Sequence, residues 1–362
     1  RPCAPSALAH AKSSRWEQAA HAVSVAAERG LGPDLVAYSA LISACSRARQ
    51  WQRALLYFEG LRSAGCRLDE FVCSAAVSAL EKGQQWEPAL QLLVEMKERS
   101  VEPSAFAYSA AIGACKGERR WDLALRLLEE MWQRQVEANA VACNAAISTC
   151  ERGGQWQSAL EVVREMQARG IEPSVVTYSA AILACRAAGR LEAPLELWRA
   201  MRAGGVAPND RTYTALMAAC ERSGEWQWAL HFLAEGWSEG LRLSPITLCS
   251  AISACVGAGR WKWALQLFQE LRRGSPVLDV VAYGAALSAC EEGRWWEGAL
   301  QLLAEMAQGG LRPNAVACCA AVGACEKALQ WQRALLLLEG ALAAGLEVDA
   351  KVYSAAVSAC EK

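Results

Sequence analysis

The sequence predicts an all-α fold, an α-solenoid of helix–turn–helix repeats that are each 35 residues long. Two columns of residues on one period support this prediction. A tryptophan recurs every 35 residues, with Leu191 at its one missing step: Trp16, Trp51, Trp86, Trp121, Trp156, Trp226, Trp261, Trp296 and Trp331. A cysteine follows the same period, with Leu80 at its one missing step: Cys45, Cys115, Cys150, Cys185, Cys220, Cys255, Cys290, Cys325 and Cys360. A solenoid requires such a period, because each repeat must present the same packing surface to the next.

Each repeat contains the spacing of two amphipathic helices. In residues 35–69, Tyr38, Leu41, Ile42 and Cys45 stand at i, i+3, i+4 and i+7, which is one face of a helix. The apolar pattern starts again after a short polar break, at Trp51. The sequence therefore predicts two antiparallel helices of about twelve residues in each repeat.

Turn residues mark where the second helix of each repeat ends. A glycine column is typical of a left-handed helix stop, and it contains Gly65, Gly170, Gly205, Gly240, Gly310 and Gly345. Prolines then mark the connection to the next repeat, at Pro103, Pro173, Pro208 and Pro313. In residues 175–209, Leu191 replaces the tryptophan and Pro194 replaces an alanine that the other repeats hold. We therefore expect this repeat to contain the most distorted second helix.

The period divides the chain into three parts. Residues 1–34 form a degenerate N-terminal repeat, because Pro2 and Pro5 interrupt its first helix. Nine tandem repeats follow, at 35–69, 70–104, 105–139, 140–174, 175–209, 210–244, 245–279, 280–314 and 315–349. Residues 350–362 supply the first helix of a further, truncated repeat. Since the chain starts at Arg1 and stops inside a repeat, we expect a fragment or processed piece from which a targeting peptide could have been lost.

Composition argues against several classes of function. No apolar run reaches the roughly 18 residues of a transmembrane helix, so no membrane partner is expected. The formal net charge of -1 gives no general attraction to nucleic acid, so any basic groove depends on local placement. The chain has three histidines and no CxxC, so zinc-ligand spacing is absent and neither a metal nor another cofactor is expected.

The sixteen cysteines are interpreted mainly as small buried core residues, which implies free thiols and a reducing compartment. The tryptophan column stands at helical spacing beside Leu and Ala, which favours core packing over an aromatic cage. On that interpretation, truncation of Trp86 or Trp121 to Ala should cost about 3–5 kcal/mol of stability.

Three segments carry a family resemblance: VVTYSAAILAC (175–185), ALQLLVEM (89–96) and GIEPSVVTYSA (170–180). They resemble the pentatricopeptide repeat in its pure 35-residue form, and the resemblance covers essentially the whole chain. The tetratricopeptide repeat has a period of about 34 residues and a different aromatic and glycine layout. The tryptophan column departs from common pentatricopeptide motifs, which often carry an aliphatic residue there. This departure bears on packing more than on the expected binding face.

The resemblance implies a right-handed superhelix whose first helices line a groove that binds single-stranded RNA, one base per repeat. It also implies an organellar role in RNA processing, stability or translation, in the plastid or the mitochondrion. Two side chains per repeat would choose the base: the residue after the Tyr38 column and the last residue of the repeat. Single-stranded RNA suits such reading, because its bases expose their Watson–Crick edges.

We call these two sets the fifth-position column and the terminal column. The fifth-position column is always small and mostly carries a hydroxyl or amide: Ser39, Ser74, Ser109, Asn144, Ser179, Thr214, Cys249, Gly284, Cys319 and Ser354. The terminal column contains only Asp, Asn and Ser: Asp69, Ser104, Asn139, Ser174, Asn209, Ser244, Asp279, Asn314 and Asp349. The same three residue types are also favoured helix N-caps, so the residues alone leave both roles open for the terminal column. The resemblance favours base reading.

A basic column stands two residues after the cysteine column, and its cationic members are Arg47, Lys82, Arg152, Arg222, Lys327 and Lys362. Gly117, Ala187, Gly257 and Glu292 occupy the same position in other repeats. The cations are candidates for contact with RNA phosphates. Their place at the end of the first helix leaves a second explanation open, because cations also stabilise helix C-termini.

The resemblance also implies a base for several repeats. Ser39 with Asp69 suggests G, while Ser109 with Asn139 and Ser179 with Asn209 suggest A. Asn144 with Ser174 suggests C, and Ser74 with Ser104 and Thr214 with Ser244 suggest a purine. The repeats of Cys249, Gly284 and Cys319 would be read by Asp279, Asn314 and Asp349 alone. The 5′ part of the expected RNA site is G-purine-A-C-A-purine.

Two other functions compete with RNA binding. A protein-binding scaffold of tetratricopeptide type would have variable residues on its concave face, not a column restricted to Asp, Asn and Ser. An RNA-editing or processing enzyme would use the repeats as an address, and its deaminase domain would need His-x-Glu and CxxC signatures. Neither signature is present, so we expect no catalytic residue and no enzymatic activity in these residues.

Overall fold

The computed structural model describes residues 16–28, 35–64, 68–136, 139–274, 278–343 and 350–361. These residues form twenty α-helices, α2 to α21, and one short 3-10 helix, with no strand among them. The predicted all-α fold is therefore confirmed. The proposed helix stops at Gly65 and Gly345, and the prolines at Pro2 and Pro5, lie outside the described residues.

The chain forms two compact units, Arg1–Ala187 and Ala188–Lys362. The first unit contains α2 (Trp16–Glu28), α3 (Leu35–Arg47), α4 (Trp51–Ser63), α5 (Glu70–Gly83), α6 (Trp86–Glu98), α7 (Ala105–Ala114), α8 (Trp121–Gln133), α9 (Ala140–Gly153), α10 (Trp156–Ala168) and α11 (Val175–Cys185). The second contains α12 (Glu192–Ala203), α13 (Asp210–Ser223), α14 (Trp226–Ser238), α15 (Pro245–Gly257), α16 (Trp261–Gly274), α17 (Val280–Glu292), α18 (Trp296–Gln308), α19 (Ala315–Lys327), α20 (Trp331–Ala343) and α21 (Ala350–Glu361).

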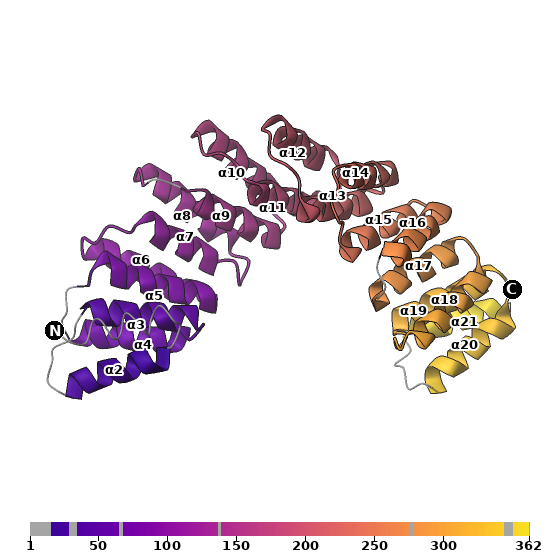
Figure 1. The fold of residues 1–362 in the computed structure, drawn as a ribbon, viewed down its shortest axis with the longest axis horizontal. Coiled ribbons are helices and arrows are strands. Elements are labelled where there is room, and N and C mark those ends of the chain that lie inside the picture. The colour runs from indigo at the N-terminus through magenta and orange to yellow at the C-terminus, as the bar shows by residue number, and fades with distance from the viewer. Residues whose placement is uncertain are drawn as a thin grey trace. The chain divides into compact units, whose positions relative to one another are not determined.

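Within each unit the helices form two layers (Figure 1). The first helices of consecutive repeats pack directly on one another, as α3, α5, α7, α9 and α11 in one unit and α13, α15, α17, α19 and α21 in the other. The second helices of consecutive repeats are bridged by long side chains, as in the ion pairs Arg62–Glu95 (3.5 Å) and Arg272–Glu305 (3.0 Å). The first helices therefore form the closer-packed layer.

Alanine explains this close approach, because a methyl side chain lets two helix backbones come near and also favours the helix itself. In the first helix of residues 35–69, Ala40 and Ala44 are buried, and Trp16 of the preceding repeat packs against them. The first-helix layer thus owes its tight packing to the alanine-rich sequence.

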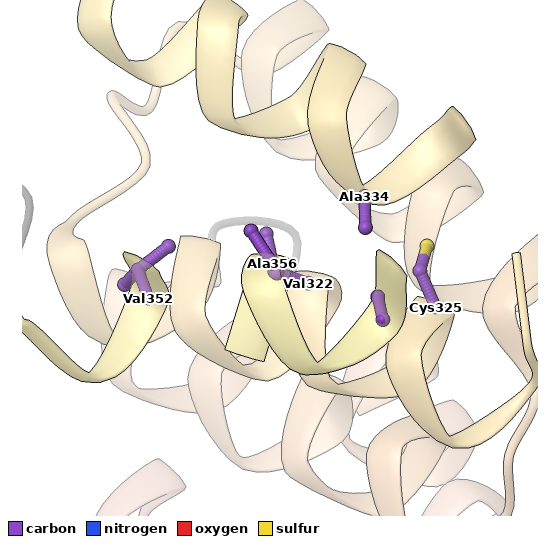
Figure 2. Close-up of a cluster of buried hydrophobic side chains, with 6 residues drawn as sticks. Val322, Cys325, Ala334, Val352 and Ala356 are labelled. Carbon is purple, nitrogen blue, oxygen red and sulfur yellow. The ribbon is translucent and has the colours of Figure 1, made fainter. Parts of the chain in front are cut away.

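The cysteine column lies in the core, as predicted, except at its end. Eight of its nine members are buried, and none of the described cysteines forms a disulfide. Figure 2 shows Cys325 with Val322, Ala334, Val352 and Ala356, where α19, α20 and α21 meet. Cys360, in the last turn of α21, is exposed. Burial raises the pKa of most of these thiols, and that of Cys185 reaches about 12, so they stay protonated and unreactive.

The tryptophan column is not a core column, which corrects the expectation from its spacing. Each described member except Trp331 is half-buried, and Trp331 is exposed. The tryptophan is the first residue of its helix, and Cα–Cβ bonds tilt toward the helix N-terminus, so its ring projects to the edge of the repeat. Three members lie on a glycine of the next repeat, since an added Cβ at Gly83, Gly153 or Gly293 would stand 2.5 or 2.6 Å from ring atoms of Trp51, Trp121 or Trp261. Trp86 instead donates to Glu118 of the next repeat at 2.6 Å.

The second helix of the repeat with Pro194 departs from the others, as predicted, although the departure is small. This helix, α12, has 12 residues, against 13 or 14 in the other second helices, and begins at Glu192, one residue later than the tryptophan position. Pro194 therefore lies in the first turn, where a backbone N–H has no intrahelical partner to lose. The larger irregularity is in the preceding helix, because α11 ends at Cys185 and continues as a 3-10 turn over Arg186–Ala188.

The predicted glycine stops are present at Gly170, Gly205, Gly240 and Gly310, whose φ angles lie between +70° and +74°. Two repeats reach the same left-handed conformation without glycine, at Ser100 (φ 58°) and Gln135 (φ 57°). The left-handed conformation is thus a property of this position in the repeat, and glycine is the residue that adopts it with least strain.

Candidate functional site

The terminal column caps the first helix of the following repeat. All eight described members are N-cap residues whose side chains accept a hydrogen bond from the third backbone N–H of that helix: Asp69, Ser104, Asn139, Ser174, Asn209, Ser244, Asp279 and Asn314. Asp349 lies outside the described residues. The acceptor distance is 2.9 Å at Asp69 and 3.0 Å at Asn139. The cap uses one oxygen of each acid or amide, and the exposed side chains at these two positions keep their second polar atom for another partner.

The fifth-position column lies in the second turn of each first helix, beside the terminal column. Oγ of Ser74 lies 3.4 Å from Oγ of Ser104, and Oγ of Ser109 lies 3.4 Å from Oδ1 of Asn139, while the Ser109 hydroxyl donates to the carbonyl of Ala105 at 2.7 Å. These are the pairs that the sequence assigns to the second and third repeats. In these repeats the two columns form one small polar cluster.

Other repeats bring the two columns together less directly. Cys249 and Asp279 share no hydrogen bond; burial, and then the charge of Asp279, raise the pKa of Cys249 to about 11. Gly284 has no side chain, and an added Cβ would meet nothing within 4 Å. Ser39 and Ser354 donate to backbone carbonyls of their own helices, Val36 and Ala350, at 3.0 and 2.9 Å, as Ser109 does to Ala105.

Sequence reasoning missed three buried threonines beside the terminal column, Thr177, Thr212 and Thr247, of which Thr177 and Thr247 also contact the fifth-position column. Each is the third residue of its helix and pairs with the N-cap. Thr177 donates to Oδ1 of Asn144 at 2.6 Å, which links Asn144 to the cap residue Ser174. A threonine three residues after Ser or Asn is a capping-box pattern, so the sequence did contain a signal for them.

The sixth repeat has the densest of these networks. Oγ1 of Thr247 lies 2.6 Å from Oγ1 of Thr214 and 2.9 Å from Oγ of Ser244, and it donates to Oδ1 of Asp210 at 3.0 Å. The same carboxylate accepts from the backbone N–H of Ser244 at 2.8 Å. The polar atoms of Thr214 and Ser244 are therefore held in fixed positions.

Sequence reasoning also missed an apolar column at the second residue of the first helices. Its eight members are exposed, from 51% at Val36 to 77% at Phe71: Val36, Phe71, Phe106, Val141, Val176, Ile246, Val281 and Val316. A repeated, exposed apolar position marks an interaction surface, because a solvated helix face is otherwise polar. It lies one helical turn before the fifth-position column.

Four members of the basic column are exposed and have no carboxylate partner among the described residues: Arg47, Lys82, Arg152 and Arg222. Lys327 differs, since its Nζ lies 2.6 Å from Glu292 and 3.3 Å from Glu291. Partial burial lowers the pKa of Lys327, but these two carboxylates outweigh that effect and raise it. Lys362 lies outside the described residues.

The residue just before the basic column adds two further cations, which sequence reasoning missed. Lys116 and Arg186 stand there in the repeats whose basic position holds Gly117 and Ala187. In six other repeats, the truncated one included, the same residue is a glutamate: Glu81, Glu151, Glu221, Glu291, Glu326 and Glu361. Three of these reach sideways to the next helix: an added Cβ at Gly113 or Gly323 would stand 2.7 or 2.8 Å from Oε1 of Glu81 or Glu291, and Ser358 donates to Glu326 at 2.6 Å.

The columns share one face of the first helices. In α3, Val36, Ser39, Ser43 and Arg47 follow at i, i+3, i+7 and i+11, which is one stripe along a helix. The first five repeats therefore present an apolar group, a small polar pair and a cation at or next to the last position, in a fixed order, while in the sixth Arg211 replaces the apolar group. Such a stripe can stack against a flat ring, hydrogen-bond the edge of that ring and pair a cation with a nearby anion.

Among the described residues, no group of three or more His, Cys, Asp or Glu side chains is placed to bind a metal ion. None of the helices in the described ranges is long and apolar enough to cross a membrane.

Two family models match the chain. A model of the pentacotripeptide-repeat region of PRORP matches residues 74–237, and a model of the PPR repeat matches residues 36–66 and 246–275. No curated protein matches the chain.

Solved structures share its helical-repeat fold. One is the pentatricopeptide repeat protein PPR10 in complex with an 18-nt psaJ RNA element, with a TM-score of 0.72 and 18% identity over 91% of this chain and 48% of that one. Another is PPR10 from maize, with a TM-score of 0.62 and 22% identity over 98% of this chain and 50% of that one. The chain thus spans about half the length of these proteins.

Proposed function

The chain belongs to the pentatricopeptide repeat family, and from that premise we propose that it binds single-stranded RNA and reads one base per repeat without catalysing a reaction. The observation that supports this proposal most is the contact between the fifth-position and terminal columns, at 3.4 Å in the second and third repeats. Ser74 and Ser109 are buried, whereas their terminal partners Ser104 and Asn139 are more accessible. A terminal side chain that is held by such a partner can direct a polar atom at a base edge, and two polar contacts to one edge discriminate bases.

The apolar column supports the same proposal. Bases stack on apolar and aromatic side chains with little regard to sequence, because every base has a π-face. Phe71 and Phe106 are exposed one turn before Ser74 and Ser109, so a base that stacks on them would present its edge to the polar pair. Stacking would supply binding affinity, while the fifth-position and terminal columns would select the base.

The unpaired cations support contact with the RNA backbone. Six cations stand at or beside the basic position of the first six repeats: Arg47, Lys82, Lys116, Arg152, Arg186 and Arg222. A helix C-terminus also favours a cation, so both explanations still apply to Arg47, Lys82, Arg152 and Arg222. Lys116 lies beyond the end of α7, and for it a phosphate is the better partner.

Selection from a random RNA pool by this chain tests the proposal. We expect enrichment of G-purine-A-C-A-purine, weaker binding of the same sequence in a duplex, because pairing hides the base edges, and RNA that stays intact during incubation. Equal retention of all sequences and of the duplex would contradict base reading, and cleaved or edited RNA would contradict a purely binding role.

The organellar role implied by the family is part of the proposal. A tagged full-length protein should localise to plastids or mitochondria, and its exclusion from both would overturn this part alone.

A further inference from the structure

We propose that the chain reads bases only with its repeats at 35–244, and that the repeats at 245–349 hold RNA by stacking without choosing bases. This inference rests on the proposed function. Two independent sets of residues, the fifth-position column and the cations, change at the same point in the chain, between the sixth and seventh repeats. Each change removes one contribution to RNA recognition.

The fifth-position column is the first set. In repeats one to six it carries a hydroxyl or an amide, and in repeats seven to nine it carries Cys249, Gly284 and Cys319. Burial is the main cause that raises the pKa of Cys249 to about 11, so its thiol stays protonated and is a weak hydrogen-bond partner. Gly284 supplies no group at all.

The terminal column cannot choose a base alone in these repeats. Oδ1 of Asp279 accepts from Ala282 N–H at 2.9 Å, and Oδ1 of Asn314 accepts from Ala317 N–H at 2.8 Å. Asp279 then offers one remaining acceptor and Asn314 one remaining donor group. Every RNA base has both a donor N–H and an acceptor on its Watson–Crick edge, so one remaining contact is satisfied by all four bases.

The cations are the second set. Each of repeats one to six has one cation at or beside the basic position, as described above. The seventh repeat has Val256 and Gly257 there, and the eighth has Glu291 and Glu292. The ninth has Lys327, whose ammonium group is held by the two glutamates of the eighth.

The apolar column continues through these repeats, with Ile246, Val281 and Val316 each exposed by 63% or more. Stacking of bases on this column needs neither a hydrogen bond nor a phosphate contact. Of base stacking, hydrogen bonds to base edges and phosphate contacts, the last three repeats thus retain stacking, which does not depend on the RNA sequence.

RNAs of six and nine nucleotides test the inference with the intact chain. In the nine-nucleotide RNA, a base change at each of six contiguous positions should weaken binding by about 5- to 150-fold, the range of a base-reading contact. At the other three positions the change should stay below about fivefold. Both RNAs carry a 5′ phosphate, so that the six-nucleotide RNA also has six phosphates. The slope of log K against log salt should then be about -4 for both lengths, because six phosphates are neutralised in each at about -0.7 apiece.

The outcomes separate this inference from the proposed function. Base discrimination at all nine positions, or a steeper salt slope for the longer RNA, overturns the inference and leaves RNA binding intact. Failure of every RNA to bind overturns the proposed function itself.

The variant Gly284→Ser gives a direct gain-of-function test. The space at Gly284 is open, and a serine there would stand beside Asn314 as Ser109 stands beside Asn139. The variant should acquire a preference for A at the eighth position, by at least about fivefold. The matched control is Gly60→Ser, which also enters open space but on a second helix, and it should change nothing. If Gly284→Ser binds like the parent, the eighth repeat does not place a base near this position, and the stacking mode is wrong.

Discussion

Asn144 depends on a neighbouring threonine for its orientation. Thr177 has one hydroxyl proton, and it is donated to Oδ1 of Asn144 at 2.6 Å. The amide oxygen of Asn144 is thereby occupied, and its NH2 group is left as the donor. A donor at this point suits the ring nitrogen and carbonyl acceptors of C, the base that the sequence assigns to the fourth repeat.

Thr177→Val should therefore loosen base choice at the fourth position. The substitution keeps the shape of the side chain but removes the hydroxyl, so either end of the Asn144 amide can face the base. We expect discrimination among bases to fall at that position only, with a stability loss of about 1 kcal/mol from the weakened cap. Competition binding with RNAs that differ at the fourth base measures it.

Thr177→Ser is the matched control, because it keeps the hydroxyl and should restore discrimination. If Thr177→Val discriminates as well as the parent, Thr177 only stabilises the helix end.

The terminal column shows why residue types alone could not settle its role. Asp, Asn and Ser are the residues that cap helices and also the residues that bond base edges. The structure places Asp69 and Asn139 in the cap, and it leaves one polar atom of each exposed, so the two roles are compatible. Sequence reasoning left capping and base reading as alternatives; the structure shows the cap, and base reading stays a prediction.

At the scale of helices, one contact between the third and fourth repeats joins a tryptophan and a glycine. Trp121, at the start of α8, lies over Gly153, at the end of α9. The periodicity predicted both helices closely. The periodicity could not predict that the tryptophan is only half-buried, because it gives the face of a helix and not the distance of a residue from the helix end.

Gly153→Ala should destabilise the fold, since its Cβ would stand 2.6 Å from Cδ1 of Trp121. We expect a loss of about 1–3 kcal/mol from the forced displacement. Trp121→Ala alone should lose a similar amount, below the 3–5 kcal/mol expected for a core site, because the ring is only half-buried. Urea unfolding of the two single variants and of the double variant gives the coupling between them.

In the Trp121→Ala background, Gly153→Ala should become neutral or stabilising, because alanine has the higher helix propensity, by up to about 1 kcal/mol. Gly60→Ala serves as control, since no atom lies within 4 Å of its added Cβ, and it should stabilise the parent. Additive losses from Trp121→Ala and Gly153→Ala would mean that the two residues do not form this contact.

At the scale of the whole chain, the net charge of -1 conceals an uneven distribution along the first helices. The first six repeats each contribute a cation, while Glu291 and Glu292 of the eighth neutralise Lys327 of the ninth. Counting residues in one column found some of these cations and missed Lys116 and Arg186, because the cation moves by one position between repeats. The pairing of Lys327 required the structure, since it joins side chains of different repeats.

The most direct test of base reading exchanges the terminal residues of two repeats, as Asp69→Asn and Asn139→Asp. Both residue types accept the cap hydrogen bond, at 2.9 Å in Asp69 and 3.0 Å in Asn139, so the unfolding midpoint should not change. The group left facing the base does change, from an acceptor to a donor in one repeat and the reverse in the other.

Competition binding with RNAs that differ at the first and third bases measures the result. We expect the first base to shift from G toward A and the third from A toward G, each by about 1–3 kcal/mol. If both preferences stay as they were while the fold is intact, the terminal column only caps helices, and these repeats do not read RNA through it.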